Sequence, residues 1–325
     1  MNVGNYYLSQ LMLSKSWHLS EYIEVLEKPP DLRVMARAVR EALSKVQVEM
    51  LVHGNATEEN ARKLADSFCG RLERLGAEPL PKLRKKEVPK LPLGTLVFEF
   101  DLAKLNPAQE NCCTQVVYQV GPTNVDLQRD ACVSLCCHIG HVSAFQKLRT
   151  ERQLGYIVQA FPAVTEHVCG FSVLVQGNRE HPKEVDRLIE EWLEDFGEEL
   201  TNMSDDDFQK NVEALVNERT QRYSRLVQET TRHWAEILPR RYKFEKVAES
   251  TRVLQKVKRQ DVVDFFETYL APNAPERRKL SVRVLGTSAG EERSDEPDQL
   301  LTCLEDLRSF HQRAEPGPQT ERTRA

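Results

Sequence analysis

Residues 145–156 read FQKLRTERQLGY, a charged stretch that closes on a Gly-Tyr pair. Apolar spacing in its first part predicts a short helix over residues 147–154, with its leucines as the buried contacts. Gly155 is expected to end that helix, because glycine enters the left-handed backbone region without steric cost. The residues that begin with Tyr156 then read as a strand. The stretch therefore predicts a helix–glycine–strand corner that holds the Arg149 guanidinium and the Tyr156 hydroxyl at defined positions.

The segments around this corner predict an α+β fold. Strands are expected where apolar residues alternate, and helices where they recur every three to four residues. Because most of the strands are joined by hairpins, we expect a mixed, largely antiparallel sheet covered by helices on one face. The expected strands are 96–100, 114–120, 156–161, 170–176 and 280–284; the expected helices are 125–139, 182–196, a long one from Ser204 that runs toward Ile237, and 261–270.

The chain is expected to divide into four segments. Residues 1–77 read helix, helix, strand, helix, and their one strand, 46–52, cannot form a sheet alone. We therefore interpret them as the C-terminal part of a truncated domain. Residues 78–92 contain four prolines, which indicates an extended linker. The basic run at residues 82–86 within it is either a solvated hinge or an anion-attracting segment. Residues 93–287 read as a complete domain, and residues 288–325 as a largely disordered tail.

Composition excludes several classes of protein. A net charge of −5 with 29% charged residues gives no overall bias toward nucleic acid or a membrane surface. No apolar run approaches the roughly 18 residues that span a bilayer. Eight cysteines in 325 residues are too few for a disulfide scaffold and fit reduced, partly buried thiols. We therefore expect a cytoplasmic protein that binds neither nucleic acid nor a membrane.

Several motifs resemble one peptidase family. The run L-R-T-x-x-Q-L-G-Y at residues 148–156 resembles a signature in the second half of insulin-degrading enzyme and nardilysin, which are zinc peptidases of the pitrilysin (inverzincin) family. YYLSQLM at residues 6–12, LVHGN at 51–55 and WAEI at 234–237 are similar to segments of that family and follow in its order. The similarity covers roughly residues 5–287.

The resemblance implies roles for two residues at the corner. In this family one half carries the zinc and the other closes a chamber over the peptide substrate. Tyr156 would donate a hydrogen bond to the oxyanion, and Arg149 would hold substrate backbone carbonyls. The alternatives are a core tyrosine at a strand start, and a surface salt bridge from Arg149 to Glu151 or Asp130.

The zinc motif of that family is absent from this chain. H-x-x-E-H places two histidines one helical turn apart with a glutamate as general base, and no such string occurs among the eight histidines. His138 and His141 have no glutamate between them. A cluster of Cys132, Cys136 and Cys137 with these histidines is better interpreted as core thiols beside surface histidines. We therefore predict no metal ligand in this chain, no bound cofactor and no peptidase activity for the chain alone, with zinc expected in an N-terminal half.

A second candidate site is a row of arginines. Arg219, Arg222 and Arg225 stand three residues apart, which would place them on one face of the long helix. The insulin-degrading branch has a lysine-rich site near this position that binds polyphosphate such as ATP. The resemblance therefore implies an anion site, and the alternative is a solvated basic helix face.

Two functions follow from these observations. The first is the C-terminal, non-zinc half of an insulin-degrading-type metalloendopeptidase, with peptide substrates and a zinc-bearing N-terminal half, in the same polypeptide or a separate chain, as partners. The second is an inactive inverzincin-like subunit that binds peptides or a partner protein. A start within a domain favours the first, and a homodimer is compatible with either.

Overall fold

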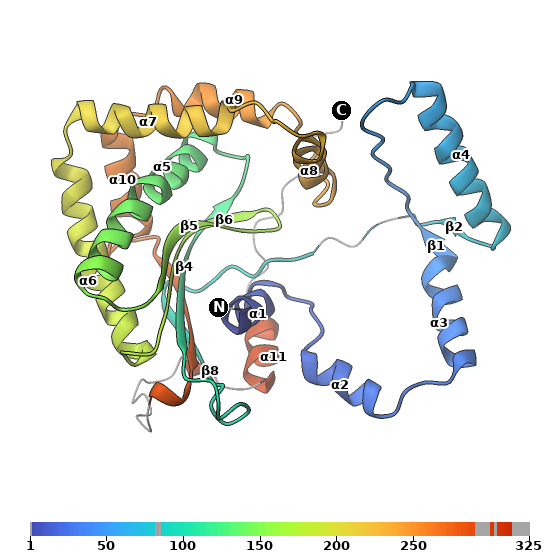
Figure 1. Ribbon diagram of the computed structural model, residues 1–325, viewed down its shortest axis with the longest axis horizontal. Coiled ribbons are helices and arrows are strands. Elements are labelled where there is room, and N and C mark those ends of the chain that lie inside the picture. Colours follow the sequence, from blue (N-terminus) through green and yellow to red (C-terminus); the bar gives the residue numbers. More distant parts are fainter. Residues whose placement is uncertain (1, 82, 84–85, 290–299, 302–303, 314–325) are drawn as a thin grey trace. The chain divides into compact units, whose positions relative to one another are not determined.

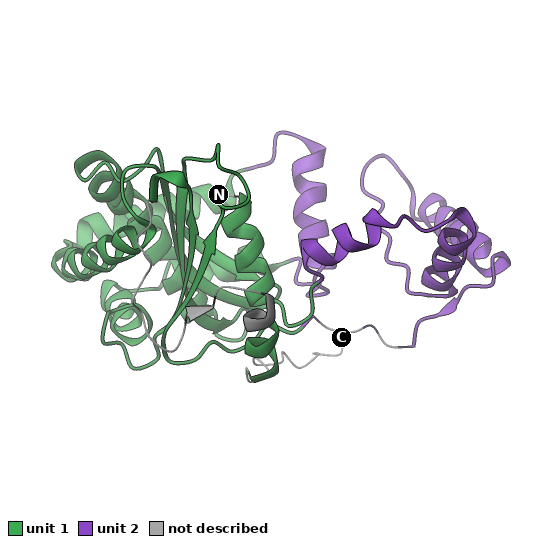
Figure 2. Cartoon of the chain, turned by 90° about the horizontal axis from the view of Figure 1, so that it is seen from below, with its two compact units in different colours: residues 1–16, 87–221, 245–325 green, residues 17–86, 222–244 purple. Residues whose placement is uncertain are grey.

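The chain folds into two compact units. The computed structural model describes residues 2–81, 83, 86–289, 300–301 and 304–313, so most of the predicted disordered tail lies outside the described residues. Unit 1 contains residues 1–16, 87–221 and 245–325; unit 2 contains residues 17–86 and 222–244 (Figure 2). This division does not follow the boundaries expected at residues 77 and 92, because residues 2–16 and 87–92 both belong to unit 1.

Unit 1 is built on a six-stranded sheet of order β5-β6-β4-β7-β3-β8 (Figure 1). The pairs β5–β6, β6–β4 and β4–β7 are antiparallel, whereas β3 runs parallel to β7 and β8. This arrangement confirms the predicted mixed, largely antiparallel sheet. The strands are β3 (Gly94–Asp101), β4 (Cys112–Pro122), β5 (Ile157–Thr165), β6 (Val168–Gly177), β7 (Arg278–Leu285) and β8 (Leu300–Leu301).

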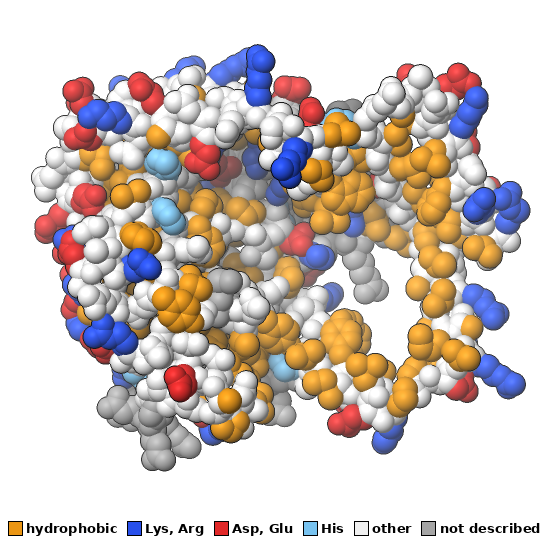
Figure 3. All heavy atoms as spheres, in the orientation of Figure 1, with side chains coloured by type: hydrophobic (Ala, Val, Ile, Leu, Met, Phe, Trp, Pro, Cys, Tyr) orange, Lys and Arg blue, Asp and Glu red, His pale blue; other side chains and the backbone are white. Residues whose placement is uncertain are grey.

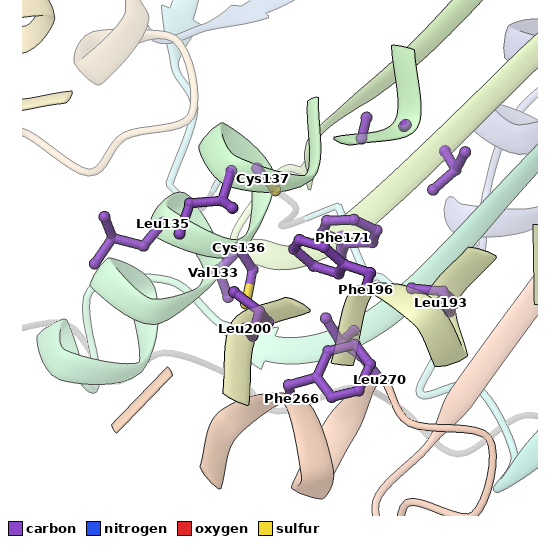
Figure 4. Packing of buried hydrophobic residues seen from close by; sticks show 14 of the residues in the cluster. Val133, Leu135, Cys136, Cys137, Phe171, Leu193, Phe196, Leu200, Phe266 and Leu270 are labelled. Atoms are coloured by element: carbon purple, nitrogen blue, oxygen red, sulfur yellow. The ribbon is translucent and has the colours of Figure 1, made fainter. Parts of the chain in front are cut away.

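One face of the sheet carries the large helices, as predicted (Figure 1). Phe171 of the sheet stacks on Trp192, which in turn stacks on Phe196 with ring centroids 5.3 Å apart. Phe266 closes the aromatic cluster edge-on against Phe196, and Cys136 lies beside it (Figure 4). The helices are α5 (Leu127–Ala144), α6 (Pro182–Asn202), α7 (Asp205–Thr220), α9 (Lys246–Leu254) and α10 (Arg259–Tyr269).

The opposite face is covered in part by the N-terminal helix α1 (Asn2–Met12). Its Tyr7 and Leu11 are buried against Phe98 and Leu280 of the sheet. The helix α11 (Leu304–Arg313) lies beside it, where a His311 ring nitrogen is 3.1 Å from the carbonyl oxygen of Leu11. The sequence shows that α1 has an apolar face but does not show which distant surface covers it, so its place in unit 1 was not predicted.

The end of the expected linker packs on the same unit. Val88 and Leu91 are fully buried. The Gln119 side chain donates to the carbonyl of Pro89 and accepts from the amide of Leu91, both at 2.9 Å. Burial and these two hydrogen bonds therefore hold residues 88–91 on unit 1.

Unit 2 exposes most of its apolar side chains. None of the residues in α2 (Leu19–Glu27), α3 (Leu32–Ser44) and α4 (Glu58–Arg74) is buried, and hydrophobic side chains gather over these helices (Figure 3). The predicted strand 46–52 is wrong in extent: only β1 (Lys45–Val46) pairs, with β2 (Glu78–Pro79). A strand needs a partner along its length, and the described partner is two residues long. The unit also contains α8 (Leu226–Ile237).

A buried charge network joins α6 to the sheet. The Asp186 carboxylate, 2% exposed, accepts hydrogen bonds from Lys279 and from Arg283, both at 2.6 Å. One helical turn later Glu190 accepts from Tyr118 and pairs with Lys279 at 2.7 Å. Burial by itself raises the pKa of the Asp186 carboxyl, but the two cations outweigh it and hold the pKa below its ordinary value.

Replacing Asp186 by asparagine should destabilise unit 1 strongly. The substitution leaves Lys279 and Arg283 buried without their counter-charge, which costs about 3–5 kcal/mol. Urea unfolding should be followed by the fluorescence of the buried Trp192, after Trp17 and Trp234 of unit 2 are replaced by phenylalanine.

The matched control is Asp195→Asn on the exposed side of the same helix, which should change the free energy of unfolding by no more than about 0.5 kcal/mol. A carboxyl whose pKa is lower in the folded chain than in the unfolded chain stabilises the fold at pH values above its unfolded pKa of about 4. That stabilisation is lost as the pH falls through the pKa of the folded chain. The difference between wild type and Asp186→Asn should therefore narrow in acid. Equal stabilities at pH 7 would contradict a structural role for the network.

Candidate functional site

The predicted corner forms, but its helix differs from the expected one. Instead of a separate helix over residues 147–154, α5 continues without a break into a π-helical segment, η1 (Phe145–Glu151). The amide of Arg152 donates to the carbonyl of Lys147, five residues back, at 3.0 Å. The wider turn is what separates this segment from a regular helix. Leu148 and Leu154 are buried, as predicted.

Gly155 is required for space and not for a left-handed conformation. Gln153 is the residue that enters the left-handed region, with φ 56°. A Cβ atom on Gly155 would lie 2.2 Å from the carbonyl oxygen of Gln176. The backbone passes this close because the amide of Tyr156 donates to that same oxygen at 3.1 Å. The prediction that Gly155 ends the helix by a left-handed turn is therefore wrong, although only glycine fits there.

Arg149 and Tyr156 lie together on the surface of this corner. Tyr156 is 51% exposed, and its hydroxyl oxygen accepts a hydrogen bond from the Gln176 amide. The guanidinium of Arg149 lies 4.8 Å from the Phe145 ring centroid, and its Nε donates to the Tyr156 carbonyl at 3.4 Å. The alternative of a core tyrosine is thus wrong. Within the described part of the chain Arg149 makes no salt bridge, whereas Glu151 pairs with Lys147.

The corner is tied to α6 by an ion pair. Arg152, directly after η1, lies 2.7 Å from the Glu191 carboxylate. Ser143, near the end of α5, accepts from the Trp192 indole at 3.1 Å and donates to Glu199 at 2.7 Å. These contacts position η1 from its rear while its outer face stays open to solvent.

The arginine row does not lie on one helix face. Helix α7 ends at Thr220, and Arg225 is the residue that caps the start of α8. Arg219 belongs to unit 1, where burial lowers the pKa of its guanidinium, whereas Arg222 belongs to unit 2. The prediction of one continuous helix is wrong because the chain leaves the helical conformation at Gln221, where ψ is 128°.

The cysteine–histidine cluster is a packed core. Cys132, Cys136 and Cys137 are buried, and burial raises the pKa of the Cys132 thiol to about 12. Burial also lowers the pKa of His138. Thiols in this environment stay protonated and are poor metal ligands, which agrees with the interpretation as core residues.

One group of potential metal ligands was not predicted from the sequence. Among the described residues, His53, Glu229 and His233 bring one ligand atom each within 4.8 Å of one another. His53 is far from the other two in sequence, which concealed the group. The available signal was the i, i+4 spacing of Glu229 and His233 on α8.

A shallow cleft of about 570 Å³ lies elsewhere in unit 1, between α6 and α10. Its lining includes Glu194, Glu198 and Phe266 and no residue of η1 or β5. Arg149 and Tyr156 therefore lie outside this cleft, with their side chains exposed. Of the described helices, none combines the length and the apolar character needed to cross a membrane.

Comparisons with known proteins agree on one group of relatives. The family described as "PQQ synthase PqqF-like, C-terminal lobe domain 4" matches residues 135–234. Insulin-degrading enzyme of Drosophila melanogaster is 28% identical over 310 residues, which cover 92% of this chain and 30% of that protein. A nardilysin-like protein of Arabidopsis thaliana is 26% identical, over 95% of this chain and 30% of its own length. The chain is a homologue of insulin-degrading enzyme and the nardilysin-like proteins.

The fold agrees with this homology. The crystal structure of pitrilysin matches with a TM-score of 0.76 and 21% identity, over 92% of this chain and 31% of pitrilysin. The chain thus spans about 30% of the length of these relatives. Like the family match at residues 135–234, the homology to insulin-degrading enzyme includes the whole corner.

Gly155→Ala should disrupt the corner of this insulin-degrading enzyme homologue by steric overlap. The added methyl meets the backbone of Gln176 and not a movable side chain, so β5 must shift at a cost of roughly 1–3 kcal/mol. Hydrogen exchange at the Tyr156 amide should accelerate with it. Gly70→Ala in α4 is the control, since the nearest atom to its added methyl is 3.9 Å away, and it should be neutral or slightly stabilising. Equal effects of the two substitutions would show that the backbone is not held closely at Gly155.

Proposed function

We propose that this chain is the C-terminal, non-zinc half of an insulin-degrading-type metalloendopeptidase. It closes the chamber over peptide substrates, and Arg149 and Tyr156 face the active site of a zinc-bearing N-terminal half. Homology to insulin-degrading enzyme over 92% of the chain supports the assignment to this kind of protein. The match to a C-terminal lobe domain supports its place within such a protein.

The observation that carries the proposal is the hydrogen bond that the Tyr156 hydroxyl oxygen accepts. The donor is the side-chain amide of Gln176. Because the hydroxyl oxygen acts as the acceptor in this bond, its own hydrogen can be donated to another group. The side chain is half exposed on an open face. A neutral O–H held in this way can donate to a substrate carbonyl oxygen as negative charge develops on it.

Arg149 supplies a positive charge beside the backbone of Tyr156. Its contact with the Phe145 ring and the Tyr156 carbonyl orients the guanidinium without neutralising it. Its remaining N–H groups can donate to backbone carbonyls of a bound peptide, in the ground state as well as in the transition state. We therefore assign Arg149 to peptide binding and Tyr156 to stabilisation of the oxyanion.

The zinc of this peptidase family has no counterpart in the chain. No H-x-x-E-H string occurs in the sequence, so no step of hydrolysis is assigned to these residues beyond binding and hydrogen-bond donation. The same absence favours a second candidate, an inactive inverzincin-like subunit that captures peptides or a partner protein. A possible homodimer would fit either candidate.

Tyr156→Phe tests the proposal in a chimera that joins the N-terminal half of fly insulin-degrading enzyme to this chain. Loss of one oxyanion donor should lower kcat about a hundredfold, while KM changes much less, because the hydrogen bond strengthens as the transition state forms. Arg149→Ala should raise KM as well as lower kcat. The assay is cleavage of a fluorogenic peptide.

Tyr22→Phe, an exposed tyrosine on α2, is the matched control and should leave both constants unchanged. The melting temperature of Tyr156→Phe should stay within about two degrees of wild type. A folded chimera without activity would favour the non-catalytic subunit. An active chimera that is indifferent to Tyr156→Phe would exclude the catalytic role of this tyrosine.

A further inference from the structure

Three potential metal ligands converge in unit 2, away from any residue used above. His53 directly precedes Gly54, where the chain turns with φ 135°. Glu229 and His233 lie one helical turn apart on α8, so their side chains share one helix face. Both segments belong to the same compact unit (Figure 2). The fold therefore brings together two imidazoles and one carboxylate from distant parts of the chain.

Hydrogen bonding fixes which nitrogen of His53 is available. The Thr230 hydroxyl lies 2.7 Å from Nδ1 of His53 and donates its hydrogen to the carbonyl of Leu226 at 2.9 Å. A hydroxyl has one hydrogen, and a carbonyl can only accept. Thr230 must therefore accept from Nδ1–H, and neutral His53 presents an unprotonated Nε2. An imidazole whose other nitrogen is anchored in this way is the usual arrangement of a metal-binding histidine.

The free nitrogen faces the carboxylate without a hydrogen bond between them. Nε2 of His53 is 3.7 Å from Oε2 of Glu229, and Nε2 of His233 is 3.9 Å from Oε1 of the same carboxylate. Both separations are too long for hydrogen bonds. The edges of a tetrahedron of zinc ligands, by comparison, are about 3.4 Å long. With one atom taken from each residue, the three ligand atoms lie within 4.8 Å of one another, so they would need to close by up to about 1.4 Å to reach these edges.

The surroundings suit a partly solvated ion. The side chains of His53, Glu229 and His233 are 23%, 47% and 28% exposed. Their imidazole rings are perpendicular, with centroids 5.5 Å apart, and Phe244 packs edge-on against His233. Three protein ligands leave a fourth position for water. A site with two imidazoles and one carboxylate matches zinc and its first-row neighbours better than calcium or magnesium, which prefer oxygen ligands.

We propose that His53, Glu229 and His233 bind a divalent first-row transition metal, with zinc the expected ion. Binding would link the segment after β1 to α8, two parts of unit 2 that are separated by more than 170 residues. Because α2, α3 and α4 of this unit bury no residue, a metal link would supply order that a hydrophobic core does not.

Zinc titration of the metal-free full-length chain tests the proposal. After dialysis against a chelator, competition with a chromophoric chelator should show one equivalent of Zn²⁺ bound with a Kd of about 1 μM or tighter. His53→Gln, Glu229→Gln and His233→Gln should each weaken binding by about tenfold to a hundredfold or more, and Thr230→Val, which keeps every ligand, by about tenfold. His138→Gln, in unit 1, is the control and should bind as wild type.

X-ray absorption of the zinc-loaded wild-type chain provides a test that needs no variant. The spectrum should show nitrogen and oxygen ligands with two imidazoles and no sulfur. Sulfur ligands would place the ion at cysteines and overturn the proposal. So would the absence of binding at about 100 μM zinc, or binding that the three ligand substitutions leave unchanged. Affinity should also fall in acid, as protons compete with the metal for the ligand atoms.

Discussion

The position of α6 depends on a carboxylate that is buried with two cations of β7. Asp186 and Glu190, one turn apart, face Lys279, Arg283 and Arg277 across the sheet. Each of these charges would be costly to bury alone, and each has a counter-charge here. We infer that the network favours the face of α6 that meets the sheet, since any other face would leave buried charges without partners.

Once that face is fixed, the other faces of α6 position the candidate site. Trp192 turns toward α5 and enters the aromatic stack with Phe171 and Phe196. Glu191 turns toward the corner and pairs with Arg152. The open face of the corner therefore carries Arg149 of η1 and Tyr156, which directly precedes β5, on a support whose rear side is buried. A surface site held in this way can be rigid although its side chains are exposed.

Much of the fold could be predicted, because periodicity reports directly on burial. Every predicted strand of the sheet in unit 1 forms, and Pro182 begins α6 where its fixed φ favours a first helical turn. Contacts between residues that are far apart in the sequence could not be predicted in this way. Alternation in residues 280–284 predicted a strand, but nothing in the sequence pairs Lys279 and Arg283 with Asp186 of α6.

The site was predictable only in part for a similar reason. The motif marked Arg149 and Tyr156, but the tight approach of Gly155 to Gln176 depends on a strand twenty residues away, and so does the hydrogen bond that orients the tyrosine. The break after Thr220 separated arginines that spacing had placed on one helix. His53 lies near Glu229 and His233 of α8 only because of tertiary contacts, which the sequence does not show.

We propose that Gln176, through its hydrogen bond to the Tyr156 hydroxyl, presents that hydroxyl to substrate. A double-mutant cycle on kcat, with Tyr156→Phe and Gln176→Met in the chimera with a zinc-bearing half, tests it most directly. If the amide acts through the hydroxyl, Gln176→Met should lower kcat about tenfold in the wild-type background and have almost no further effect once Tyr156 is phenylalanine. Additive losses from the two substitutions would show that they act independently and would contradict the account.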